Sequence, residues 1–545
     1  MQQDVNENIL SIRDLEVSFG GNPVLHRVSF DLKKGERVAI VGQSGSGKST
    51  TIGAVLRLLP GEGRITGGTI RLGDGPDAVE LAEASEAQMR SIRGKRLGLV
   101  PQDPMSNLNP SMKVGAQIAD ALMSNGMRGR AEVKRRAIEL MTEAGIPDAE
   151  RRYGQYPHEF SGGMRQRVLI AVALAGEPDL LIADEPTSAL DVTVQRQILN
   201  HLQALVDARG TSLLFVTHDL GLAADRTDRI IVMADGRIVE VGTPREILLN
   251  PQEEYTRKLV AAAPSVTAAL QMEAPGATAA STAGPAPILV VQDLCKEFTL
   301  RGQRGGTVRA VDNVSFTVNR GTTTAVVGES GSGKTTVARI ILGLETATAG
   351  QALVDGKSIT ASRGAERRAL RRMVQPVFQD PYGSLDPTHS IERLIDEPLR
   401  IFNVGDKGSR RRRVAELLDQ VALPHSVAQR RPNELSGGQR QRVAIARALA
   451  LEPELIICDE AVSALDVLVQ DQILNLLADL QDRLGLTYLF ITHDLAVVRQ
   501  IAHNVLVMKA GAVVEEGSVD KVFLRPEAQY TEELLGAIPG AAFAA

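Results

Sequence analysis

The chain has 545 residues, of which 43% are hydrophobic, 23% charged and only 3% aromatic, and its formal net charge is −5. This length exceeds what one hydrophobic core usually organises, so we expect two domains of a soluble globular protein. The negative net charge excludes nucleic-acid binding that is driven by overall charge, although it leaves room for a local basic patch.

The sequence shows no secretory signal and no stretch long enough for a membrane span, and it has only two cysteines. The N-terminus MQQDVNENIL has no basic stretch followed by an apolar core, and apolar stretches such as VLIAVALAG at 168–176 are about half a membrane span. We therefore predict that the chain neither crosses a membrane nor leaves the cytoplasm. Cys295 and Cys458 are too few for a disulfide framework or a four-thiolate metal site. Cys458 ends the apolar run ELIIC and is predicted to be a buried strand residue.

The first motif with chemical content is VGQSGSGKST at 41–50, which follows the short β-branched run RVAIVG and precedes residues with helical spacing. It satisfies the phosphate-loop (Walker A) pattern G-x-x-x-x-G-K-[ST]. In such a loop the backbone N–H groups face phosphate, the lysine neutralises the β- and γ-oxygens and the hydroxyl binds Mg²⁺. The residues predicted to bind nucleotide are Gly42, Ser44, Gly45, Ser46, Gly47, Lys48, Ser49 and Thr50.

Two further segments of the first half carry polar groups at predicted element ends. SGGMRQR places Ser161, Gly162 and Gly163 at the start of a helix, which makes a second anion-binding site. DLLIADE is an apolar strand that ends in Asp184, which can reach Mg²⁺ through its water shell. Glu185 follows directly and can polarise an attacking water.

Most of the first half recurs in the second. Lys48 matches Lys334, 286 residues later, and from the SGG segments onward the matched motifs are 275 residues apart. Each copy thus has two phosphate-binding edges for one nucleotide, which is explained if the copies face each other head to tail. The predicted second-copy residues are Gly328, Ser330, Gly331, Ser332, Gly333, Lys334, Thr335, Thr336, Ser436, Gly437, Gly438, Asp459 and Glu460.

The segment between the copies, 265–287, is nearly uncharged and rich in Ala, Thr, Gly and Pro. We predict a flexible linker there, with a reach of roughly 25 to 30 Å, between domains 8–264 and 288–545. Fully apolar strands that end in polar groups, such as SLLFVTHD at 212–219, suit a parallel sheet covered on both faces. The predicted fold class of each domain is therefore α/β.

The order of Walker A loop, SGGQ-type signature, Asp-Glu pair, SALD loop and histidine after a strand resembles the ATP-binding cassette (ABC) ATPases, in two copies over essentially the whole chain. The resemblance implies two tandem P-loop NTPase domains, each with a mainly parallel sheet, an antiparallel β part and a helical subdomain. It also implies ATPase activity, with ATP and Mg²⁺ bound.

The resemblance assigns roles to further residues. It implies Q-loop glutamines at Gln102 and Gln379, switch histidines that contact the γ-phosphate at His218 and His493, D-loop residues at Asp191 and Asp466, and adenine-stacking aromatics at Phe19 and Phe298. A strand phenylalanine is as readily part of the core, so the stacking role has an alternative. The implied Mg²⁺ ligands are Ser49, Gln102, Asp184, Thr335, Gln379 and Asp459.

Longer sequence segments narrow the resemblance to one group of ABC ATPases. VPQDPMSNLNP, VFQDPYGSLDP, YPHEFSGGMRQR, YTRKLVAAAP and YTEELLGAIP resemble the ATPases of bacterial dipeptide, oligopeptide and nickel importers, where two separate ATPases commonly pair. This chain resembles such a pair fused. The resemblance implies two transmembrane permease subunits and an extracytoplasmic substrate-binding protein as partners, no nucleic acid, and a peripheral location on the cytoplasmic face of the bacterial plasma membrane.

Three expectations accompany this resemblance. Neither copy has the cysteine-bearing extension with which many relatives hold an iron–sulfur cluster, so we predict no cluster. The loops after Gln102 and Gln379 are expected to contact the permeases, with Leu108 and Leu385 at the contact. The run at 410–413 is predicted to be a solvated helix face, with lipid headgroup contact as the alternative.

The predicted function is an ATP-hydrolysing motor for uptake of di- or oligopeptides, with nickel or another solute as the alternative cargo. A rival of another class is a soluble tandem-cassette translation factor, but those proteins join their cassettes by a long, charged helical arm. DNA-repair and ribosome-recycling cassette proteins need cysteine-rich metal modules, and this sequence, with two cysteines, has none. A fused sugar-import ATPase is a further alternative, although such proteins often have one degenerate site.

Overall fold

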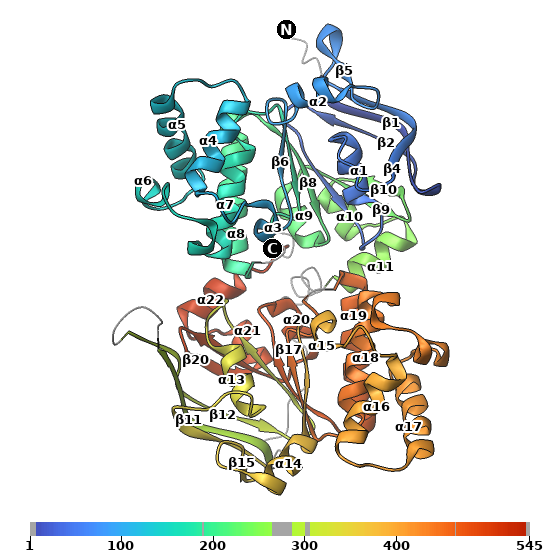
Figure 1. The fold of residues 1–545 in the computed structure, drawn as a ribbon, viewed down its shortest axis with the longest axis vertical. Helices are drawn as coiled ribbons and strands as arrows, with labels where there is room; N and C mark the ends of the chain where they lie inside the picture. Colours follow the sequence, from blue (N-terminus) through green and yellow to red (C-terminus); the bar gives the residue numbers. More distant parts are fainter. Residues whose placement is uncertain (1–6, 188–189, 264–285, 300–305, 464, 541–545) are drawn as a thin grey trace. The chain divides into compact units, whose positions relative to one another are not determined.

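The computed structural model describes residues 7–187, 190–263, 286–299, 306–463 and 465–540. They form two compact units, 7–263 with 539–540 and 286–538, and each unit is described by itself (Figure 1). The predicted linker lies outside the described residues except for its last two positions, and Pro287 begins a strand instead of ending the linker. The other predicted domain limits stay predictions.

The described residues of the first unit form two sheets. One is antiparallel with the strand order β2-β1-β4-β5, and the other has the order β10-β9-β3-β8-β7-β6 and is parallel except for β10. The strands are β1 Asn8–Phe19, β2 Asn22–Lys33, β3 Arg37–Val41, β4 Gly63–Leu72, β5 Val79–Glu80, β6 Leu97–Val100, β7 Leu180–Asp184, β8 Ser212–Thr217, β9 Arg229–Ala234 and β10 Arg237–Gly242.

Helices flank the parallel sheet of the first unit, and α4, α5 and α7 stand together beside it (Figure 1). The helices are α1 Lys48–Val55, α2 Glu86–Ile92, α3 Pro104–Asn107, α4 Val114–Ser124, α5 Arg130–Glu143, α6 Ala149–Arg152, α7 Gly162–Ala173, α8 Val192–Arg209, α9 Leu220–Arg226, α10 Pro244–Leu249 and α11 Glu254–Ala262.

The second unit repeats this plan, with the strand orders β12-β11-β14-β15 and β16-β17-β18-β13-β19-β20. Its strands are β11 Pro287–Thr299, β12 Thr307–Asn319, β13 Thr323–Val327, β14 Ala349–Val354, β15 Lys357–Ser358, β16 Val374–Val377, β17 Leu455–Asp459, β18 Thr487–Ile491, β19 Asn504–Lys509 and β20 Ala512–Ser518. Its helices are α13 Lys334–Ile341, α14 Gly364–Met373, α15 Pro381–Ser384, α16 Ile391–Ile401, α17 Lys407–Gln420, α18 Gly437–Leu449, α19 Val467–Leu484, α20 Leu495–Ile501, α21 Val519–Leu524 and α22 Gln529–Leu535.

The predicted α/β fold is confirmed in both units, down to the antiparallel β part and the helical subdomain. The parallel strands are short and apolar because helices cover both of their faces, so β3, β8 and β18 are buried almost along their whole length. Strand β7 is buried until its last residue, Asp184, which is only partly exposed. The polar residues therefore come at the carboxyl edge of the sheet, where the strands stop.

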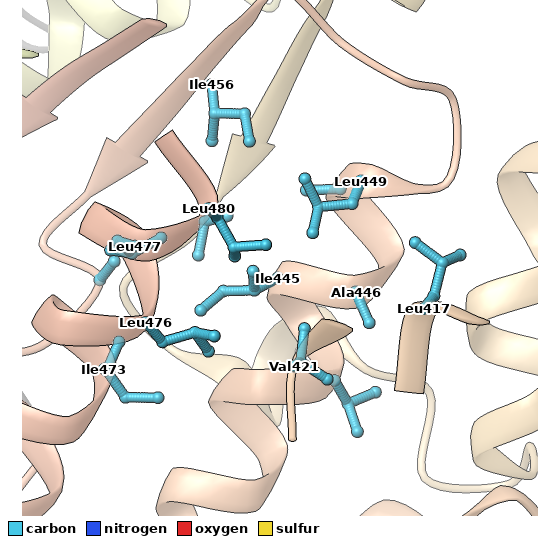
Figure 2. Packing of buried hydrophobic residues seen from close by; sticks show 14 of the residues in the cluster. Leu417, Val421, Ile445, Ala446, Leu449, Ile456, Ile473, Leu476, Leu477 and Leu480 are labelled. Carbon is cyan, nitrogen blue, oxygen red and sulfur yellow. The ribbon is translucent and has the colours of Figure 1, made fainter. Parts of the chain in front are cut away.

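The buried side chains of the helical subdomains correct one expectation: those of the first unit form a cluster of their own, and those of the second unit form one cluster with residues of the parallel sheet, such as Ile456. In the second unit, Ile445 and Leu449 of α18 pack near Leu477 and Leu480 of α19 (Figure 2). Leu385 is 1% exposed in this core and Leu108 is 3% exposed in the matching core of the first unit. The expectation that these two leucines contact a partner is wrong, because both anchor their loops to the subdomain interior.

Instead, each of these loops exposes the second residue of its short helix. Met105 on α3 is 65% exposed and Tyr382 on α15 is 56% exposed. These two side chains are therefore the large hydrophobic groups that the loops expose.

Smaller predictions can be checked against the described residues. Cys458 is fully buried, as predicted, and burial raises the pKa of its thiol to about 12. The run at 410–413 lies on a helix, α17, as predicted. Three of its arginines form ion pairs with acidic residues; the side chain of Arg411 is 74% exposed, whereas those of Arg410 and Arg413 are 21% and 24% exposed. Contact of this run with lipid headgroups stays the alternative. None of the helices in the described parts of the chain combines the length and apolar composition that a bilayer crossing requires.

Candidate active site

The phosphate loop of each unit runs between a buried strand and a helix. In the first unit β3 ends at Val41 and α1 begins at Lys48, as the sequence predicted. At the centre of the loop Gly45 has a φ of 83°, in the left-handed region, and nothing lies within 4 Å of the position that a Cβ would take. Gly331 of the second unit is equally open, with a φ of 81°. Bare backbone beside open space suits the close approach of phosphate.

The loop lysines are folded back onto their own loops. Lys48 Nζ donates hydrogen bonds to the carbonyl oxygens of Gly42 at 2.7 Å and of Gln43 at 3.1 Å. Lys334 Nζ makes the two matching hydrogen bonds, both at 2.7 Å. Phosphate oxygens of ATP would be stronger, charged acceptors for the same ammonium groups.

The predicted Mg²⁺ ligands Asp184 and Asp459 end β7 and β17. In each of them the buried Oδ1 atom has no hydrogen-bond partner among the described residues. Burial raises the pKa of Asp184 to about 6 and Glu185 adds to the shift, while Lys48 and Ser49 oppose it. Burial and the acidic neighbour raise the pKa of Asp459 in the same way.

These donors fit Mg²⁺, because the ion takes carboxylate and hydroxyl oxygens together with substrate phosphates. The residues that would hold it are Ser49 with Asp184 in one unit and Thr335 with Asp459 in the other. Gln102 and Gln379, the other predicted ligands, donate their amide N–H groups to Glu185 and Glu460, and their role as ligands stays a prediction. When bound, the ion neutralises charge on the β- and γ-phosphates of ATP. The prediction that no iron–sulfur cluster is present stays a prediction.

Glu185 and Glu460 follow these aspartates in a strained backbone conformation. Their φ values are 44° and 48°, in the left-handed region that non-glycine residues seldom adopt. The Glu185 N–H donates to the Val216 carbonyl at 2.8 Å, and the Glu460 N–H donates to the Ile491 carbonyl at 2.9 Å. Such a conformation costs on the order of 1–3 kcal/mol and persists where its surroundings enforce it, which is common at functional sites.

Each strained glutamate is shared by a glutamine and a histidine. Gln102 Nε2 donates to Glu185 Oε2 at 2.8 Å, and His218 Nδ1 lies 3.3 Å from the same oxygen. The second unit repeats the glutamine contact, from Gln379 Nε2 to Glu460 Oε2 at 2.6 Å, whereas His493 Nδ1 lies 3.4 Å from the other oxygen, Oε1. The structure therefore brings together, within each unit, the phosphate loop, the two acids and the glutamine and histidine to which the resemblance gives the Q-loop and switch roles.

The glutamate and the histidine shift each other's pKa in opposite directions. Burial acts to raise the pKa of Glu185, but the hydrogen bond and charge of His218 outweigh it and hold this pKa below its ordinary value. Burial acts to lower the pKa of His218, but Glu185 outweighs it and raises this pKa. The second pair shifts in the same directions. At neutral pH each glutamate is thus a carboxylate, the form that can polarise water.

The signature serines begin helices, as predicted. Ser161 Oγ accepts the Met164 N–H at 3.4 Å at the start of α7, and Ser436 Oγ accepts the Gln439 N–H at 3.3 Å at the start of α18. Among the described residues, no hydrogen bond or ion pair joins either serine to the phosphate loop of its own unit.

The signature glycines differ in what requires them. A Cβ on Gly163 or Gly438 would lie 2.6 or 2.4 Å from a valine Cγ1, so packing inside the unit excludes a side chain there. A Cβ on Gly437 would meet only Leu465 Cδ2, at the ordinary contact distance of 3.6 Å. Its own unit therefore gives no reason for glycine at 437, whereas a ligand that approaches the helix start would.

The remaining predicted residues have local contacts. Asp191 begins α8 and accepts the Val194 N–H at 3.1 Å, and Asp466 caps α19 in the same way. Phe19 is partly buried against the β core, whereas Phe298 is 40% exposed with Lys296 Nζ at 4.9 Å from its ring centre. Their roles toward nucleotide stay predictions.

Sequence reasoning missed one pair of residues at the phosphate loops. Tyr255 Oη accepts the Gln43 N–H at 3.1 Å, and Tyr530 Oη accepts the Glu329 N–H at 3.1 Å. The only signal was that both tyrosines lie in the duplicated C-terminal motifs YTRKLVAAAP and YTEELLGAIP.

Two family models match the chain. The model described as "ABC transporter" matches residues 25–188 and 311–463. The model described as "Oligopeptide/dipeptide transporter, C-terminal region" matches residues 239–286, which include Tyr255.

Curated relatives match almost the full length. The chain is 42% identical over 564 residues to the "Glutathione import ATP-binding protein GsiA" of Salmonella choleraesuis (strain SC-B67), covering 98% of this chain and 90% of that protein. It is 43% identical over 562 residues to the protein of the same name from Escherichia coli O157:H7, with the same coverage. Among solved structures, the ATP-binding cassette MJ0796 bound to ADP and Pi is 31% identical with a TM-score of 0.39, covering 42% of this chain and 98% of that chain.

The strained glutamates give the first test. Changing Glu185 and Glu460 together to Gln removes the carboxylates but keeps their shape, so ATP turnover should fall by roughly 10²–10⁴-fold. Affinity for MgATP, measured by equilibrium binding, should stay within about twofold because the phosphate contacts remain.

The matched control is Glu177→Gln with Glu452→Gln, since these glutamates also have positive φ values, of 52° and 53°, but lie outside the site. This control should keep full turnover. A site whose single Glu→Gln variant hydrolyses ATP at the original rate is not a required site.

Proposed function

The chain belongs to the ABC transporter family, and from this premise we propose that it is the ATP-hydrolysing subunit of an importer for short peptides of about the size of glutathione. The observation that carries the proposal is two complete sets of ATPase residues in one chain that also matches the oligopeptide/dipeptide transporter C-terminal region. Relatives named for glutathione import support a peptide cargo over nickel. Two permeases, which hold this chain at the cytoplasmic face of the membrane, and an extracytoplasmic substrate-binding protein complete the importer.

In this proposal each ATP lies between the phosphate loop of one copy and the signature helix start of the other. Two features support the shared site: the signature serines are not bonded to their own phosphate loops, and Gly437 has free space that its own unit does not require. The site with Lys48 and Glu185 would then use 436–438, and the site with Lys334 and Glu460 would use 161–163.

Gly437→Asp tests the sharing. The substitution puts a negative side chain at the phosphate-binding edge, while Asp is favourable in the first turn of α18, so folding should be preserved. In a Glu460→Gln background, where only the Glu185 site hydrolyses, Gly437→Asp should abolish single-turnover hydrolysis of ATP. In a Glu185→Gln background it should leave hydrolysis nearly unchanged.

The mirror variant Gly162→Asp should give the opposite pattern and serves as its control. If each Gly→Asp variant instead abolishes hydrolysis at the site whose glutamate lies in the same copy, the signature segment acts within its own unit and the shared site is refuted.

A groove beside the Q-loop glutamine of the second unit supports the permease contact. It has a volume of about 510 Å³ and lies between α14, β16 and the end of α16. Phe378, directly before Gln379, lines it together with the exposed Leu344 and Ile401. Because Gln379 donates to the strained Glu460, a permease segment in this groove would sit one residue away from the hydrolysis site. We propose that such a segment couples hydrolysis to transport.

Leu344→Glu with Ile401→Glu tests the groove. These side chains are 58% and 57% exposed, so charge should not disturb folding, and ATPase activity of the purified chain should stay within about twofold. Uptake by cells should fall sharply, because each substitution removes an apolar contact surface and places a carboxylate beside the arginines that line the same groove, at 367, 368 and 371. The control is Leu484→Glu, at a leucine that is 44% exposed on α19 outside the groove, and it should support normal uptake. Undiminished uptake by the groove variant would contradict the coupling role.

The cargo is tested by transport. A strain that lacks this gene should lose uptake of labelled glutathione or of a labelled di- or tripeptide, and the wild-type chain should restore it, whereas Glu185→Gln with Glu460→Gln should not. Loss of nickel uptake with intact uptake of every peptide would overturn the peptide assignment. Copurification with ribosomal proteins, instead of with permeases and a binding protein, would support the translation factor.

A further inference from the structure

We infer that Tyr255 and Tyr530 are positioning residues for the nucleotide: the C-terminal helix of each unit holds the first turn of the phosphate loop through a tyrosine hydroxyl. The inference rests on the nucleotide-binding role proposed for these loops. Tyr255 lies on α11 and Tyr530 on α22, and their Oη atoms accept the N–H of Gln43 and Glu329, each at 3.1 Å. In both units this is the residue after the first glycine of the loop.

Residue 43 is held from two sides. Its N–H is bound by the tyrosine, and its carbonyl accepts a hydrogen bond from Lys48 Nζ at 3.1 Å. The far side of the loop is held by the sheet, since the Gly236 N–H donates to the Ser46 carbonyl at 3.1 Å. The tyrosine therefore attaches the loop to a helix that lies outside the sheet. When ATP draws the lysine toward phosphate, the tyrosine still fixes residue 43.

A second contact fixes the segment that carries each tyrosine. The carboxylate of Glu240 on β10 accepts the N–H groups of Gln252 and Glu253, at 2.8 and 3.1 Å, just before α11. Glu515 on β20 does the same for the N–H groups before α22, at 2.9 and 3.1 Å. A strand carboxylate thus fixes the start of the helix, and the helix positions the tyrosine hydroxyl against the phosphate loop. The arrangement is the same in both units.

Packing of the rings in the core does not by itself explain why both matched positions carry tyrosine. Tyr255 is only partly buried, yet its hydroxyl makes the same bond as that of Tyr530, which is 7% exposed. The ring of Tyr530 has Lys509 Nζ at 4.3 Å from its centre, whereas the matching position in the first unit is Ala234. The surroundings of the two rings therefore differ, and the hydroxyl-to-loop bond is what they share.

This bond acts on nucleotide affinity by preorganisation. The loop is rich in glycines with positive φ, such as Gly42, Gly45 and Gly47, so its backbone has much freedom to lose when phosphate binds. An anchor that restricts the loop beforehand lowers this cost, and the gain appears in binding free energy. By reciprocity, bound nucleotide must stabilise the seating of α11 and α22.

The test uses the full chain with Tyr255→Phe and Tyr530→Phe together, which removes both hydroxyls and keeps both rings. The dissociation constant for MgADP, measured by calorimetry, should rise by roughly two- to tenfold, the effect of one net hydrogen bond per site. The KM for ATP should rise by a similar factor while kcat changes less than about twofold, because the anchor acts equally on bound ground state and transition state. In the wild-type chain MgADP should also slow amide exchange in α11 and α22, and this slowing should be lost in the variant.

The control is Tyr488→Phe, which removes a buried hydroxyl that donates to the Leu477 carbonyl at 2.9 Å inside the second unit. It should lower the melting temperature and leave the MgADP affinity unchanged. An unchanged affinity in the Tyr255 and Tyr530 variant, or an equal loss in the control, overturns the inference. A wild-type chain that binds no MgADP refutes the nucleotide site itself, which is a different result.

If the double variant does not fold, amide exchange in the wild-type chain decides the question. The amides of Gln43 and Glu329 should then be protected relative to exposed amides of the same loops, at Ser44 and Gly331. Exchange of Gln43 and Glu329 as fast as these exposed neighbours would overturn the inference.

Discussion

Parallel pairing of β3, β8 and β7 is the constraint on which the rest of each unit depends. In the first unit Val41 pairs with Thr217 and Asp184 pairs with Val216, so the phosphate loop, the histidine segment and the two acids leave the sheet side by side at one edge. A slip of one residue would turn these polar ends toward the covering helices, because side chains alternate between the faces of a strand. Burial of the apolar strands on both faces fixes their register, and this register fixes the positions of the polar residues at the strand ends.

The same pairing accounts for the strain at Glu185 and Glu460. Each N–H continues the ladder by one bond beyond the strand end, and the residue takes a left-handed conformation. This turn places the carboxylate between a glutamine from the helical subdomain side and a histidine from the next strand end. One carboxylate thus contacts both Gln102, three residues before the exposed Met105, and the histidine after β8.

The two units share their chemistry and differ at their outer faces. The glutamine–glutamate–histidine contacts repeat within a few tenths of an ångström. By contrast, the exposed residue after the Q-loop is Met105 in one unit and Tyr382 in the other, and the ring of Tyr382 has the Arg440 guanidinium at 3.8 Å from its centre. The two units are therefore alike in these side-chain contacts and different in the exposed side chains of their loops.

The amino-acid sequence by itself determined the duplication, the α/β class, the phosphate loops and the residues at the strand ends, because these depend on local patterns: a glycine-rich loop after a β-branched run, and acids after an apolar strand. It did not show that Leu108 and Leu385 are buried, because short irregular loops have no periodicity that tells which side chain points inward. It also did not show that Tyr255 reaches Gln43, 212 residues away along the chain. Such contacts are decided only by the tertiary structure, since the sheet register and the seating of a helix on a strand carboxylate bring together atoms that no local pattern relates.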